Sequence, residues 1–92
     1  MAGIPHLEGA ESGCYGSADC HFLPGTTVRT VTQELQARLQ SQGYRLNLSY
    51  RDTGLRVYEL SREGEPAQFL HIASDNAGRD TFYVLAPQQQ TL

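Results

Sequence analysis

The chain contains no lysine and no tryptophan, and only two of its 92 residues are cysteines. All seven basic residues are therefore arginines, and ten acidic residues give a formal net charge of −3 at pH 7. A nucleic-acid-binding surface is usually a concentrated basic patch, whereas these arginines are scattered and outnumbered by acids. We therefore expect no nucleic-acid binding. The exclusive use of arginine is typical of a GC-rich genome, which we interpret as bacterial.

Long hydrophobic runs are also missing. A membrane-spanning helix needs roughly 20 consecutive apolar residues, and no stretch of the sequence approaches that length. The first residues, MAGIPHLEGAE, lack the positive cluster and the apolar stretch of a secretory signal. We therefore expect no transmembrane segment, and we expect the chain to be either cytosolic or the mature form of an exported protein.

The size of the chain limits its core. A single domain of this length buries only roughly 60 to 65% of the surface that its unfolded chain exposes, so a covalent bond or a partner would add appreciably to stability. Residues 1–25 contain five glycines, two prolines and no sustained periodicity, which predicts an irregular N-terminal arm. We expect a single α+β domain over residues 26–87 and a polar tail over 88–92.

One helix is expected in residues 26–43. Its apolar positions repeat at three and four residues, as on the buried face of an amphipathic helix: Val28, Val31, Leu35 and Leu39. Thr26 or Thr27 is a suitable N-cap, and Gly43 can adopt the left-handed conformation that ends a helix. Such an ending would place Tyr44 against Leu39.

After Gly43 the hydrophobic period changes to two, which predicts strands. In residues 44–50 the alternation places Tyr44, Leu46, Leu48 and Tyr50 on one face. The part of this face that carries Tyr44, Leu46 and Leu48 would share the core with the helix. Further strands are expected over residues 55–62, 67–73 and 81–86, separated by turn-forming segments. Because short connections make sequential strands antiparallel neighbours, the predicted fold is one amphipathic helix packed on a four-stranded antiparallel meander, preceded by the irregular arm that contains the cysteines. A strand swap or an inserted N-terminal strand from residues 3–7 remains an alternative.

Both cysteines lie in the segment GCYGSADCHF, residues 13–22. The favoured interpretation is a Cys14–Cys20 disulfide, because a loop rich in glycine and small residues brings two sulfurs together easily. By reducing the conformational entropy of the unfolded chain, this disulfide would stabilise the fold by roughly 2 to 2.5 kcal/mol. Stable disulfides occur in oxidising compartments. Two alternatives remain open, namely free thiols and a copper or zinc site formed by Cys14, Cys20, His21 and His6.

No other motif predicts catalysis or a cofactor. The C-x5-C spacing differs from the C-x-x-C-H of haem attachment and from the C-x-x-C of thioredoxin-like proteins. Asp52, Thr53 and Gly54 match the triplet of aspartic proteases, but they also suit a hairpin turn, which is the interpretation we favour. His71 is expected to be a half-exposed or hydrogen-bonded strand residue. We therefore expect a protein that is not an enzyme and has no cofactor.

The strands carry more apolar residues than one helix can cover. Tyr58 and Leu60 fall on the opposite face of their strand from Leu55 and Val57. Such a surplus suggests a partner, and the candidate interaction surface is Tyr58, Leu60, Phe69 and Tyr83. The sequence therefore predicts a small non-catalytic accessory module of the bacterial envelope, periplasmic or extracellular with a lipid anchor as an option, whose partner is another envelope protein.

Overall fold

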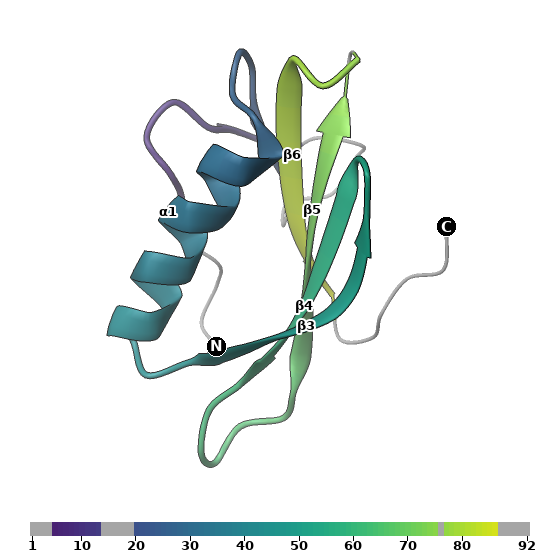
Figure 1. The fold of residues 1–92 in the computed structure, drawn as a ribbon. Coiled ribbons are helices and arrows are strands. Elements are labelled where there is room, and N and C mark those ends of the chain that lie inside the picture. Colours follow the sequence, from purple (N-terminus) through teal and green to yellow (C-terminus); the bar gives the residue numbers. More distant parts are fainter. Residues whose placement is uncertain (1–4, 14–19, 76, 87–92) are drawn as a thin grey trace.

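The computed structural model of the protein describes residues 5–13, 20–75 and 77–86, and Figure 1 shows one helix lying across one face of an antiparallel sheet. The helix, α1, is Val28–Ser41. The strands are β1 (Glu11–Ser12), β2 (Cys20–Leu23), β3 (Arg45–Asp52), β4 (Leu55–Ser61), β5 (Gln68–Asp75) and β6 (Asp80–Ala86). They form one six-stranded sheet in the order β1-β2-β6-β5-β4-β3, and every neighbouring pair is antiparallel.

The predicted four-stranded sheet preceded by an irregular arm is therefore wrong. The strands β3 to β6 do form the expected meander, but β2 from the N-terminal segment pairs with β6, and β1 pairs with β2. The prediction missed β2 because it has only four residues, lies between glycine-rich and proline-containing segments, and lacks polar alternation. Cys20, His21 and Leu23 are all buried, so neither face of this strand is marked by polar residues.

The helix begins and ends as its sequence predicts. The side chain of Thr27 accepts a hydrogen bond from the Thr30 N–H, which identifies Thr27 as the N-cap. At the other end Gly43 has φ of 89°, and its N–H donates to the Gln40 carbonyl while the Tyr44 N–H donates to that of Leu39. This pair of bonds is a Schellman motif, and it places Tyr44 in the same buried cluster as Leu39.

The core lies between α1 and the sheet. Val31, Leu35 and Leu39 of the helix are completely buried, and they share one cluster with residues of six other segments: Leu7, Leu23, Tyr44, Leu60, Leu70, Ile72 and Tyr83. Burial of each such aliphatic side chain contributes about 1.5 to 3 kcal/mol. Within the described part of the chain no helix is long and apolar enough to cross a membrane.

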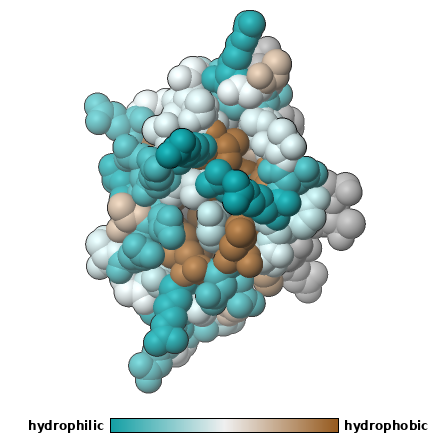
Figure 2. All heavy atoms as spheres, viewed as in Figure 1, coloured by the Kyte–Doolittle hydropathy of each residue, from teal (hydrophilic) through white to brown (hydrophobic). Residues whose placement is uncertain are grey.

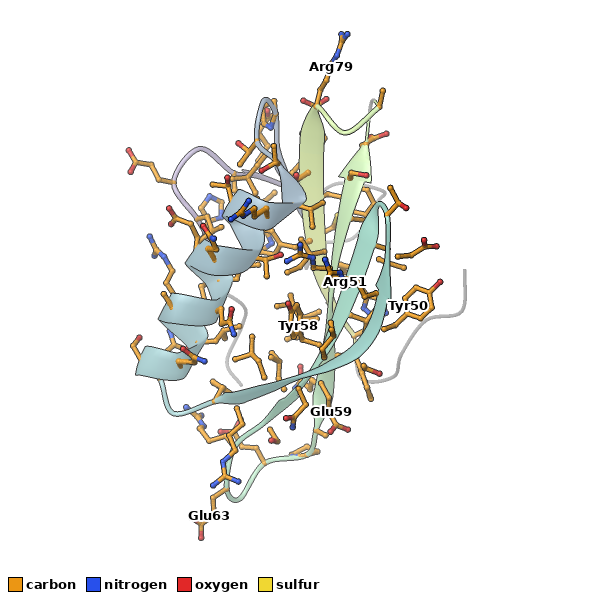
Figure 3. The ribbon with its side chains drawn as sticks, in the orientation of Figure 1. Tyr50, Arg51, Tyr58, Glu59, Glu63 and Arg79 are labelled. Atoms are coloured by element: carbon orange, nitrogen blue, oxygen red, sulfur yellow. The ribbon has the colours of Figure 1, made fainter. Side chains whose placement is uncertain are left out.

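Strand β3 departs from the expected alternation. Its pairing with β4 shifts between Leu48 and Tyr50, which is the signature of a β-bulge around Ser49. The bulge turns Tyr50 to the face of the sheet opposite the helix, as Figure 3 shows. Leu48 is 51% exposed, so the prediction that it shares the core is wrong, although Tyr44 and Leu46 do pack there. Tyr50 is 43% exposed.

Candidate functional site

Strand β3 forms one edge of the sheet. It pairs with β4 on one side, and no described strand lies on its other side. Its eight residues make it as long as any strand of the sheet, and only Leu46 among them is even partly buried. An edge of this length presents backbone N–H and C=O groups that another extended chain can pair with.

Leu48 and Tyr50 are the exposed large hydrophobic residues of the described chain, and both belong to this edge. Figure 2 shows apolar side chains reaching the surface in the middle of the view, bordered by hydrophilic ones. Charged residues and a bulge commonly protect an edge strand from uncontrolled pairing, and β3 has both, with Arg45, Arg51 and Asp52 near its ends. The edge therefore combines protection against aggregation with two apolar contacts. The charges in RLNLSYRD were the sequence signal that could have identified it.

Three of the four residues predicted as an interaction surface lie beneath the helix instead. Tyr83 is completely buried and Leu60 is 1% exposed, and both belong to the core under α1, against which the partly buried Tyr58 also packs. Phe69 is half-buried. It lies on the other face of the sheet, because it is next to the core residue Leu70 in β5 and neighbouring strand residues point to opposite faces; its partner in β4 is Glu59. The helix thus covers Tyr58 and Leu60, the apolar residues that we expected from the sequence to remain exposed for a partner.

The predicted disulfide and the alternative metal site involve Cys14, which lies outside the described residues. Cys20 is 2% exposed and pairs with Val84, whereas His21 is 6% exposed and pairs with Tyr83. Neighbouring residues of a strand point to opposite faces, so β2 directs Cys20 and His21 to opposite sides of the sheet. No group of three potential metal-binding side chains is found in residues 5–13, 20–75 and 77–86.

The two N-terminal histidines do come together. The ring of His21 stacks on that of Tyr83, with centroids 4.9 Å apart and planes 4° apart, and the His6 ring lies 5.0 Å from it in an edge arrangement. The Tyr83 hydroxyl donates to the Pro5 carbonyl at 2.8 Å and accepts from the Leu7 N–H at 3.1 Å. Burial raises the pKa of this hydroxyl. This cluster fixes the segment before β1 to the sheet.

The triplet Asp52, Thr53 and Gly54 forms the turn between β3 and β4, as predicted. Asp52 is exposed, and its carboxylate accepts hydrogen bonds from the Thr53 N–H at 2.7 Å and from the Tyr50 hydroxyl at 3.3 Å. His71, predicted to be either half-exposed or hydrogen-bonded, is 4% exposed and has a hydrogen bond with the backbone of Phe69. Burial lowers the pKa of His71, and this hydrogen bond opposes the shift.

An open hollow of about 870 Å³ lies beside this turn, between the N-terminal end of α1 and the sheet. We call it the arginine hollow, because Arg29, Arg51 and Arg56 line it together with Asp52 and a set of small or apolar residues: Thr27, Val28, Thr53, Gly54, Ser74, Ala77 and Gly78. No local pattern in the sequence indicates this hollow, because the three arginines come from the helix and from two strands.

Comparison of the chain with protein-family models, curated proteins and solved structures finds no match.

Proposed function

We propose that the protein is a non-catalytic binding module that recognises another protein through the β3 edge. The observation that carries this proposal is the position of Leu48 and Tyr50, the two exposed large hydrophobic residues, on a long edge strand. In strand addition, main-chain hydrogen bonds supply affinity and contacts with alternate side chains supply specificity. The β3 edge offers both kinds of contact.

The bulge gives the edge two apolar contacts on different faces. Leu48 pairs with Tyr58, whose side chain packs against the helix-covered core, and Tyr50 pairs with Val57 on the opposite face. An added strand with apolar residues on both of its faces would therefore find one contact on each side of the sheet. This arrangement favours a specific partner segment over any extended chain.

We further propose that the protein acts in the bacterial envelope, as a periplasmic or extracellular protein. This part rests on the sequence, through the predicted Cys14–Cys20 disulfide. It is tested by intact mass and thiol alkylation of protein isolated without reductant. A mass two hydrogens below the reduced value, with alkylation only after reduction, supports export, whereas two freely alkylated thiols contradict it.

The binding surface is tested by photocrosslinking from single positions in living cells. A photoreactive phenylalanine analogue at Asn47, an exposed residue of β3, should give a discrete protein adduct. The matched control places the analogue at Gln40, an exposed residue of α1. We expect no adduct of that mass from Gln40.

A double variant separates specific binding from simple proximity. Leu48→Ser with Tyr50→Ser should remove most of the Asn47 adduct while leaving the fold intact, because exposed side chains contribute little to stability. Equal adducts from Asn47 and Gln40, or an adduct that the double variant leaves unchanged, would contradict the proposed surface.

A further inference from the structure

The arginine hollow concentrates positive charge that the described chain does not neutralise. Three of the seven arginines of the chain line it, in a protein whose net charge is −3. No ion pair joins Arg29, Arg51 or Arg56 to an acidic residue of the described segments, whereas Arg62 elsewhere on the surface pairs with Glu65.

Each of the three arginines occupies a position where its positive charge is unfavourable. Arg51 lies directly opposite Arg56 in the β3–β4 ladder, and like charges at such positions repel. Arg56 in turn pairs with Ile72 of the core, so both arginines lie on the helix side of the sheet, and Figure 3 shows Arg51 on that side. Arg29 stands in the first turn of α1, where no acidic residue is present.

The one acidic residue of the hollow does not relieve this charge. The carboxylate of Asp52 accepts hydrogen bonds from the Thr53 N–H and the Tyr50 hydroxyl. Because neighbouring strand residues point to opposite faces, Asp52 lies on the face opposite Arg51, which it follows in β3. A guanidinium group offers planar pairs of N–H donors that match a carboxylate. The hollow is therefore built to receive acidic groups from outside the described chain.

The hollow also adjoins the edge at which we place the partner. Arg51 follows Tyr50 directly in β3, so a strand added to β3 would carry its helix-side residues along the mouth of the hollow. From this juxtaposition we infer that the partner segment is an acidic peptide, whose Asp or Glu side chains bind Arg51, Arg56 and Arg29 while its backbone pairs with β3. This inference rests on the proposed function and adds the chemistry of the partner.

The experiment selects binders to the intact protein from a random library of displayed peptides as long as β3, eight residues. We expect enrichment of Asp and Glu at alternate positions. The affinity of an enriched peptide should fall about tenfold for Arg51→Gln and for Arg56→Gln, because each loses charge-assisted hydrogen bonds. The matched control, Arg45→Gln on the same strand but opposite Ser61, should change affinity by less than about twofold.

The outcomes separate this inference from the proposed function. Enriched peptides that lose affinity with Leu48→Ser and Tyr50→Ser but not with Arg51→Gln or Arg56→Gln would overturn the acidic partner and leave the edge intact. A library without binders would contradict both proposals. A final experiment titrates inorganic phosphate, and separately an enriched acidic peptide, into isotope-labelled protein and follows the backbone amide signals by NMR. Shifts of the Arg29 and Arg51 amide signals with phosphate but not with the peptide would show that the peptide does not occupy the arginine hollow.

Discussion

The Tyr83 hydroxyl donates a hydrogen bond to the Pro5 carbonyl oxygen over 2.8 Å, although 78 positions separate the two residues. The same hydroxyl accepts from the Leu7 N–H, and Leu7 is 2% exposed within the core cluster. One side chain of β6 therefore anchors the N-terminal segment to the sheet. The ring below it is completely buried and stacks on His21, so the anchor itself is held rigidly.

Replacing Tyr83 by Phe tests this anchor. The variant keeps the ring but leaves the buried Leu7 N–H and the part-buried Pro5 carbonyl without this partner, so the free energy of unfolding should fall by about 1 to 3 kcal/mol. The matched control is Tyr50→Phe, whose hydroxyl bonds Asp52 at an exposed site and should matter by less than about 0.5 kcal/mol. Urea denaturation measures both, and equal losses would show that the Tyr83 bonds carry no special weight.

Ser74 leaves no room for a side chain at Gly54, in the turn between β3 and β4. A Cβ atom at Gly54 would lie 2.6 Å from the Ser74 Oγ but 3.9 Å from its Cβ. Gly54→Ala should therefore cost about 1 to 2 kcal/mol through overpacking. Adding Ser74→Ala should recover much of that loss, because only the oxygen clashes. A double-mutant cycle by chemical denaturation measures the coupling, and strictly additive effects would be contrary to this account.

His71 should make the stability depend on pH. Burial lowers its pKa below the ordinary value of 6.5, so at pH below 6.5 the unfolded state binds a proton that the folded state does not. The neutral ring thus contributes stability that is fully present above pH 6.5 and is lost as pH falls toward the lowered pKa. The slope of unfolding free energy against pH in this window should decrease in His71→Gln. The exposed His6, replaced by Gln, provides the control, and a slope that only the His6 variant reduces would refute the assignment.

The repulsion between Arg51 and Arg56 should be measurable as salt-dependent stability. Arg51→Gln removes a like charge directly opposite Arg56, so at low ionic strength the protein should gain about 0.2 to 0.5 kcal/mol. The gain should vanish near 1 M salt, where the screening length is about 3 Å. Arg45→Gln, opposite Ser61, removes the same charge without a facing arginine. If both variants showed the same salt dependence, the gain in stability would come from the change in net charge and not from the repulsion between Arg51 and Arg56.

Local signals in the sequence predicted the elements that are fixed by nearby residues. The spacing of Val31, Leu35 and Leu39 predicted α1, and Gly43 with Tyr44 predicted the Schellman ending, because both depend on contacts within a few residues. Regular alternation and turn residues likewise predicted the meander from β3 to β6. Domain bounds at 26–87 and 88–92 remain predictions.

What the sequence did not predict depends on partners distant in the chain. The strand Cys20–Leu23 exists because it pairs with Phe82 and its neighbours in β6, and a four-residue segment buried on both faces has no periodic signal of its own. The bulge at Ser49 depends on how β3 aligns with β4. The arginine hollow requires three residues from separate elements to meet, so charges that are scattered in sequence gather in space.

Hydrogen–deuterium exchange shows whether a partner adds a strand to β3. Exchange is compared between the protein alone and its complex with the partner captured from Asn47. The account predicts slowed exchange of backbone amides within Arg45–Asp52, since strand addition gives the outward N–H groups new acceptors. Protection confined to α1 or to β1, with the β3 amides unchanged, would contradict it.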